Sequence, residues 1–205
     1  MKVGSIRFGT RELLDIAIAW AALSVAFALF FGGGGRTILY RPGVLVGLLP
    51  ASLVTAGLGF LLHEMAHKVT AIRFGQVAEF RADYGMLFLA VAGALAGFLF
   101  AAPGAVYHEG RSTLRENGLI ALAGPLTNVA LGMAFLPLEL ALGGTLGNVA
   151  ALGVRINFLL AGFNMIPFGP LDGNTVKTWS LPAFVAFGLP CFALAAWALF
   201  GFSFL

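Results

Sequence analysis

Six long apolar runs occupy most of this sequence, and short segments rich in glycine, proline or charge separate them. The runs lie at about residues 13–31, 44–74, 86–107, 118–142, 149–166 and 182–205. About 20 apolar residues in a helix cross the roughly 30 Å hydrocarbon core of a bilayer. Only 10% of the 205 residues are charged, against about 25% in soluble domains, so the chain cannot cover a water-facing surface. The sequence therefore predicts an all-α integral membrane protein with about five to six transmembrane helices.

No polar stretch is long enough to form a soluble domain, which predicts a single membrane-embedded domain over residues 1–205. The net charge of +3 arises mostly from Lys and Arg between the apolar runs. That pattern is typical of loops beside lipid headgroups and not of a nucleic-acid surface. The lone cysteine, Cys191, excludes an internal disulfide. The lipid bilayer is thus the first partner that the composition predicts.

The distribution of basic residues predicts how the chain is oriented in the membrane. Lys2, Arg7 and Arg11 precede the first run and place the N-terminus in the cytoplasm. That run has about 19 residues, enough to span a bilayer, and no clear cleavage site follows it. We therefore expect a retained helix and not a signal peptide. The second run ends near Lys68 and Arg73, so its end is also expected on the cytoplasmic side of a multi-pass cell-membrane protein.

The motif His63-Glu64-Met65-Ala66-His67 stands near the cytoplasmic end of the second run. Residues four apart share one face of a helix, so the two imidazoles can bind one Zn²⁺ ion. Glu64 lies beside them, where it can take a proton from a metal-bound water. Ionisable side chains inside a membrane segment are costly and usually functional, which argues against a chance match. The motif therefore predicts a zinc site with Glu64 as the catalytic base.

A catalytic zinc ion needs a third protein ligand besides two histidines. Asp172 is the best candidate, because it ends an apolar run in a segment broken by two prolines and two glycines, residues 164–173. Irregular backbone at membrane depth is tolerated where it lines a wet cavity. An ordinary surface turn is the alternative, since Asp-Gly is a common turn pair. On the residues alone, both interpretations stay open.

Three ordered motifs together resemble the site-2 protease family of intramembrane zinc metalloproteases. They are His63-Glu64-x-x-His67, Gly124-Pro125-x-x-Asn128, and Asn164-x-x-Pro167 followed by Leu171-Asp172-Gly173. The resemblance covers about residues 50–180. It implies that His63, His67 and Asp172 hold one zinc ion and that Glu64 is the general base. It also implies that Asn164 positions the substrate or the developing oxyanion, and that the substrate is a membrane-spanning or membrane-tethered protein.

A packing role is expected for Gly124, Pro125 and Asn128. Small residues allow helices to approach closely in a membrane, and an asparagine can bridge two helices.

The depth of Asp172 predicts the path of the run at residues 86–107. If this run crossed the membrane, Asp172 would emerge on the side opposite His63. If it enters and returns, Asp172 comes back to the level of the histidines. We therefore expect a re-entrant or short β element between the second and third core helices. The segment at 104–107 corresponds in position to a sheet strand of the resembled family, and we hypothesise that its edge pairs with an unwound substrate; a strand that serves only as a lid is the alternative.

Other functions would use some of the same residues. A membrane metal transporter or a proteolytically silent zinc-binding protein would share the ligands, although neither needs a base such as Glu64 between them. Another class of membrane zincin takes a later Glu as third ligand, but of the later acidic residues only Asp172 stands in a recognisable context. His108 is expected in a solvated, charged loop and not as a ligand, and the glycines at 32–35 are expected to form a flexible loop.

Overall fold

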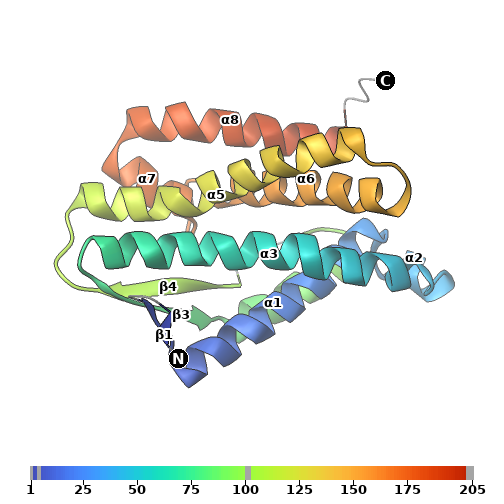
Figure 1. Cartoon of the computed structure of the whole chain (residues 1–205), viewed down its shortest axis with the longest axis horizontal. Coiled ribbons are helices and arrows are strands. Elements are labelled where there is room, and N and C mark those ends of the chain that lie inside the picture. The colour runs from blue at the N-terminus through green and yellow to red at the C-terminus, as the bar shows by residue number, and fades with distance from the viewer. Residues whose placement is uncertain (1, 4–5, 100–102, 202–205) are drawn as a thin grey trace. The chain divides into compact units, whose positions relative to one another are not determined.

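Helices make up most of the chain in the computed structural model, which describes residues 2–3, 6–99 and 103–201 (Figure 1). The helices are α1 (Thr10–Phe31), α2 (Gly34–Tyr40), α3 (Val44–Arg73), α4 (Tyr84–Ala96), α5 (Leu114–Ala141), α6 (Gly144–Asn164), α7 (Asp172–Trp179) and α8 (Leu181–Phe200). The strands are β1 (Lys2–Val3), β2 (Ile6–Arg7), β3 (Val77–Ala82) and β4 (Gly104–Glu109). Strands β1 and β2 form an antiparallel pair, and β3 and β4 form a second two-stranded sheet.

Five of the described helices, α1, α3, α5, α6 and α8, are long and apolar enough to cross a membrane. They correspond to five of the six apolar runs. The prediction of an all-α integral membrane protein with a short β element is therefore confirmed. The last run was expected to reach residue 205, but α8 ends at Phe200 and residues 202–205 lie outside the described part of the chain.

Helix α4 occupies the sixth run and is too short to span a bilayer, with 13 residues. The two ends of the segment that contains α4 lie next to each other. The backbone N–H of Asp83, just after β3, donates to the carbonyl of Pro103, just before β4 (3.0 Å). At the other end of these strands, Gly110 lies against Gln76. The two strands are therefore antiparallel, and the chain between them leaves the sheet and returns to it, as a re-entrant element requires.

The chain divides into two compact units, of which the first comprises Met1–Leu61 and Glu79–Tyr107. Within it, α1 and α2 pack against each other and both pack against α4. The indole N–H of Trp20 on α1 donates to the carbonyl of Leu53 on α3 (3.1 Å), and a β-carbon at Gly57 would overlap the same indole ring. The missing side chain at Gly57 therefore allows α1 to approach α3 closely.

Two carboxylates of α1 bind the backbone of β3 in this first unit. Glu12 is fully buried and accepts the backbone N–H of Phe80 (3.0 Å). Asp15 is 2% exposed and accepts the backbone N–H of Ala82 (3.4 Å) and the hydroxyl of Tyr84 (2.6 Å). Buried carboxylates are costly unless hydrogen bonds satisfy them, and these bonds also provide acceptors for strand N–H groups. These hydrogen bonds hold the start of α1 against one edge of β3.

The second unit comprises Leu62–Ala78 and His108–Leu205. Helix α5 packs against α6 and α7, and α8 packs against the same two helices. A buried cluster joins all four of them: Ala121, Leu122, Ala161, Met165, Val176 and Cys191. Close approach depends on glycines, since a β-carbon at Gly132 would overlap the ring of Phe158 and one at Gly118 would overlap Trp179. This unit contains every residue of the candidate site.

Two local predictions are wrong. The glycines at 32–35 were expected to form a loop, but Gly32 ends α1, Gly33 makes a left-handed turn (φ 88°), and the next two begin α2. His108 was expected in a solvated loop, but it lies on β4 and is half-buried. Burial and the nearby charge of His67 both lower the pKa of His108. From Tyr107 to Glu109 exposed and half-buried residues alternate, and the strand continues further than the charges of this segment suggested.

Candidate active site

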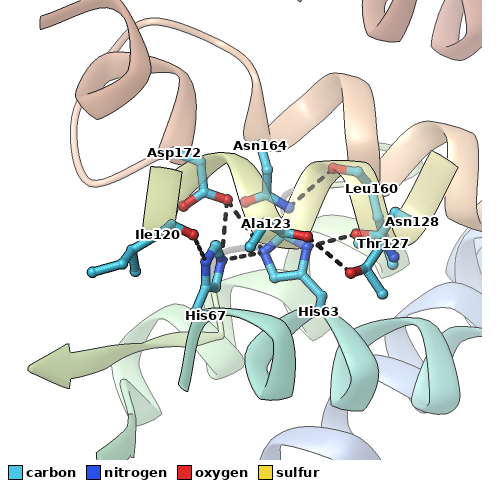
Figure 2. Close-up of polar contacts among 9 residues, drawn as sticks. All are labelled: His63, His67, Ile120, Ala123, Thr127, Asn128, Leu160, Asn164 and Asp172. Carbon is cyan, nitrogen blue, oxygen red and sulfur yellow. Dashed lines mark hydrogen bonds and ion pairs between the residues drawn. The ribbon is translucent and has the colours of Figure 1, made fainter. Parts of the chain in front are cut away.

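Two histidines on the last part of α3 form the base of the site (Figure 2). His63 is 5% exposed and His67 is 7% exposed, and their ring centres lie 4.6 Å apart. Their spacing of four residues places them on one helix face, as the sequence predicts. The two Nε2 atoms lie 2.9 Å apart and point into the same space.

Asp172 approaches these nitrogen atoms from the first residue of α7 (Figure 2). Its Oδ2 atom lies 3.2 Å from Nε2 of His63 and 3.3 Å from Nε2 of His67. The preceding loop, residues 165–171, brings the chain from the end of α6 back to this point. The structure therefore places Asp172 with the two histidines, and the alternative of an isolated surface turn is wrong.

The three ligand atoms fit a tetrahedral metal ion. They all lie within 4.8 Å of one another, and the side chain of Asp172 is 17% exposed. Bonds of about 2.0–2.1 Å from a tetrahedral zinc ion to nitrogen and oxygen place its ligands about 3.3 Å apart. Two of the three measured separations are within about 0.1 Å of that value, and the third is shorter. Two histidines and a carboxylate with a fourth position open are a ligand set that catalytic zinc accepts.

Gly124 on α5 keeps this space clear. A β-carbon on residue 124 would lie 2.5 Å from Nε2 of His63 and even closer to Nε2 of His67. It would therefore crowd both nitrogens and reduce the space for an ion bound to them. The absence of a side chain at residue 124 is thus a requirement of the site as well as of helix packing.

Hydrogen bonds behind the rings orient both histidines. Nδ1 of His67 lies 2.7 Å from the backbone carbonyl oxygen of Ile120, and Nδ1 of His63 lies 2.6 Å from Oδ1 of Asn128. An oxygen acceptor at Nδ1 requires hydrogen on that nitrogen, which leaves the lone pair on Nε2 for a metal ion. The sequence predicts a packing role for Gly124 and Asn128, but the structure brings both of them to the metal-binding imidazoles.

Glu64 lies on the same turn of α3 as the histidines and is 6% exposed. Among the described residues, its Oε2 atom is buried and has no hydrogen-bond partner. A buried carboxylate oxygen in this state is costly unless water or a metal-bound group binds it. The arrangement therefore leaves a proton acceptor beside the metal-binding atoms.

Asn164, the last residue of α6, is half-buried near Asp172 (Figure 2). Its Nδ2 atom donates to the carbonyl of Leu160 within the same helix (3.0 Å). This residue is therefore beside the site, but its donor must leave Leu160 before it can bind a substrate oxygen.

The charge of the site favours an ionised Asp172. Burial by itself raises the pKa of this carboxyl group, but His67 and His63 outweigh that effect and lower the pKa to about 2. The two imidazoles thus favour the ionised form of this carboxyl group.

Sequence reasoning missed Asn157, which lies on α6 and is fully buried. It accepts a hydrogen bond from Asn128 (3.0 Å). A polar amide in the middle of an apolar run, seven residues before Asn164 and therefore close to the same helix face, was the available signal.

A comparison with known proteins decides the family. A protein of Methanocaldococcus jannaschii is 38% identical over 198 residues, which cover 95% of this chain and 97% of that protein. Its name is "Putative zinc metalloprotease MJ0611". This chain belongs to the site-2 protease family.

Two further relatives carry the same form of name, "Putative zinc metalloprotease". Rip3 of Mycobacterium tuberculosis is 33% identical over 147 residues, covering 69% of this chain and 32% of Rip3. YwhC of Bacillus subtilis is 29% identical over 162 residues, covering 67% of this chain and 71% of YwhC. No family model matches the chain, and no solved structure matches it significantly. The relative from Methanocaldococcus jannaschii confirms the resemblance to site-2 proteases that the motifs indicate.

Proposed function

We propose that this chain is an intramembrane zinc metalloprotease that hydrolyses peptide bonds of membrane-spanning or membrane-tethered proteins. The observation that carries the proposal is the convergence of His63, His67 and Asp172 within 4.8 Å, next to the buried Oε2 of Glu64, which has no hydrogen-bond partner in the part of the chain that the structure describes. The names of the relatives, all zinc metalloproteases, support the choice of metal and of reaction.

The residues of the site have two separate roles, metal binding and proton transfer. His63 and His67 would hold zinc through Nε2, and Asp172 through Oδ2. A bound zinc ion supplies Lewis acidity, which lowers the pKa of water towards about 7 and polarises a carbonyl. Glu64 takes the proton of the attacking water on its carboxylate and later transfers it to the leaving amine nitrogen. Its position between the two histidines favours this role over a purely binding site.

Asn164 is proposed to bind the substrate. When its amide leaves the carbonyl of Leu160, Nδ2 can donate to the substrate carbonyl or to the oxyanion that develops from it. One such donor is typically worth about 10²–10³ in kcat. We therefore expect Asn164→Ala to retain zinc and to slow cleavage by about that factor.

The surroundings of the site suggest where the reaction occurs. The histidines lie on a helix long and apolar enough to span a membrane, in the second half of its length. With the N-terminus in the cytoplasm, this end of α3 is on the cytoplasmic side. We propose that residues 1–205 act as one membrane-embedded protease domain of the cell membrane and that water reaches the site from the cytoplasm.

Cleavage of a single-span test substrate by the purified protein, beside Glu64→Gln and with zinc measured in both, tests the proposal. We expect about one zinc per chain in both proteins and cleavage by the unchanged protein alone. Zinc in both without cleavage in either would reject the protease in favour of a silent binder or a metal transporter, which metal flux into vesicles would distinguish. The absence of zinc from both would reject the site.

A further inference from the structure

A series of three hydrogen bonds connects His63 to the backbone of α6. Nδ1 of His63 lies 2.6 Å from Oδ1 of Asn128. Nδ2 of Asn128 donates to Oδ1 of Asn157 over 3.0 Å, and Nδ2 of Asn157 donates to the carbonyl oxygen of Gly153 over 2.9 Å. Both asparagines are fully buried, so these bonds are shielded from exchange with bulk water.

The series has a fixed direction, which is set at its far end. The carbonyl oxygen of Gly153 can only accept, so Asn157 must turn its NH₂ group towards it and its Oδ1 towards Asn128. Asn128 must then donate with Nδ2 to Asn157, which leaves its Oδ1 facing His63. An amide oxygen can only accept as well, so Nδ1 of His63 must carry the hydrogen.

We propose that Asn157 is a positioning residue that acts through Asn128 to hold His63 in the tautomer with hydrogen on Nδ1. This tautomer leaves the lone pair on Nε2, the atom that faces His67 and Asp172. The inference rests on the proposed metal site and adds to it a residue that lies outside the three sequence motifs. Changes in such supporting residues typically cost about 10–100-fold in metal affinity or activity.

The two histidines differ in how they are held. Nδ1 of His67 is hydrogen-bonded to the main-chain carbonyl of Ile120. No side-chain rotation can replace this acceptor with a donor. Asn128 can rotate its amide by half a turn and present Nδ2 to His63 instead. The ring would then place its hydrogen on Nε2 and could not bind a metal ion there. Asn157 prevents this reversal, because its own oxygen requires a donor from Asn128.

A packing role for Asn157 makes a different prediction. An asparagine that only joins α5 to α6 stabilises the helix pair, and its loss lowers stability without changing the ring of His63. The tautomer of His63 therefore separates the two roles.

Nitrogen-15 NMR of the histidine-labelled, metal-free protein reads the tautomer directly, at a pH where the rings are neutral. Because Oδ2 of Asp172 lies 3.2 Å from Nε2 of His63 and would itself accept a hydrogen there, every protein in this measurement also carries Asp172→Ala. The chain has only three histidines, which keeps the spectrum simple. In this background we expect His63 to carry hydrogen on Nδ1 both without further change and with Asn148→Leu, a matched control at an exposed position of the same helix. With Asn157→Leu added we expect a mixture of both tautomers. In the protein that retains Asp172, Asn157→Leu should weaken zinc binding about 10–100-fold.

A rescue experiment completes the test. In Asn128→Asp the carboxylate has acceptors only, so it fixes hydrogen on Nδ1 of His63 without help from residue 157. Adding Asn157→Leu to Asn128→Asp should therefore leave the tautomer unchanged. If Asn157→Leu does not fold, Asn157→Ala removes the same amide and leaves room for its neighbours.

An Asn157 variant that folds and keeps the Nδ1 hydrogen and the zinc affinity of the control overturns the proposal. The tautomer is measured without metal and without substrate. A failure of the unchanged protein to bind zinc or to cleave would instead reject the proposed function, so the two failures remain distinguishable.

Discussion

Gly173 lies against the backbone carbonyl of Met165, and a β-carbon on residue 173 would overlap that carbonyl group. The two residues flank the loop between α6 and α7. Their contact closes this loop at the point where Asp172 begins α7 and faces the histidines. The glycine after Asp172 therefore sets how near the carboxylate comes to the rest of the site.

We expect Gly173→Ala to push α7 away from Met165 and to carry Asp172 with it. Zinc affinity should fall by about tenfold or more, as for other changes that displace a metal ligand. Competitive titration with a chelator measures the affinity. Gly143→Ala is the matched control, because residue 143 has nothing within 4 Å of a β-carbon and a φ of −101°. Equal affinities in the two variants would show that this contact does not position Asp172.

A methyl group at residue 124 should exclude zinc altogether. In Gly124→Ala the new carbon would lie against the Nε2 atoms of both His63 and His67. Alanine favours a helix by about 1 kcal/mol over glycine, so α5 itself is not weakened and the loss would be specific to the site. Metal analysis after purification provides the measurement. Gly47→Ala, on α3 with nothing within 4 Å, should keep its zinc; full zinc in Gly124→Ala would contradict the geometry described here.

Two of the three candidate metal ligands could be predicted from the residues alone because their chemistry is local. His63 and His67 need only a helix to share a face, and the apolar run supplies it. Asp172 stayed open between a ligand and a surface turn on the residues alone, and only the family resemblance favoured the ligand. Asn157 was missed because its role depends on which helix packs against α5, and periodicity does not reveal the neighbour of a helix. Gly124 was assigned to packing for the same reason, since nothing in the sequence shows which side chains lie against this glycine.

The elements missed are those with weak hydropathy signals. Helix α7 has only eight residues, and strand β3 was taken as a break between two runs although Ala78 and Phe80 are buried and Val77 is exposed. This alternation with period two was the available signal. The spanning helices were predictable because a bilayer demands long apolar runs, whereas short elements depend on contacts made after the chain folds.

Removal of the Glu12 carboxylate should expose the backbone of β3. In Glu12→Ala the N–H of Phe80 loses its acceptor, which costs about 1–3 kcal/mol for a buried donor. Hydrogen exchange in the peptide containing residues 77–82 should therefore speed up. Glu79→Ala is the control, because the side chain of Glu79 is 38% exposed and pairs only with Arg81 among the contacts of the described residues. Equal protection in both variants would show that α1 does not fasten this strand.

The proposed orientation can be tested with single cysteines. Arg7, Arg41 and Arg111 are exposed, and the native Cys191 is buried and should not react. We expect Arg7→Cys and Arg111→Cys to be labelled by a membrane-impermeant reagent from the cytoplasmic side, and Arg41→Cys from the opposite side. The re-entrant path expected for the run at residues 86–107 predicts this pattern. Labelling of residues 7 and 111 from opposite sides would mean that this segment crosses the membrane.

The carboxylates of α1 also determine how the β3–β4 sheet can grow. N–H groups of alternate residues in a strand point to the same edge, and Glu12 and Asp15 bind those of Phe80 and Ala82. With these donors already bound, an incoming extended polypeptide finds no ladder to join along β3. If the sheet pairs with an extended substrate, as hypothesised from the sequence, the pairing is therefore expected along β4. The two carboxylates of α1 would then restrict such a substrate to one edge of the sheet.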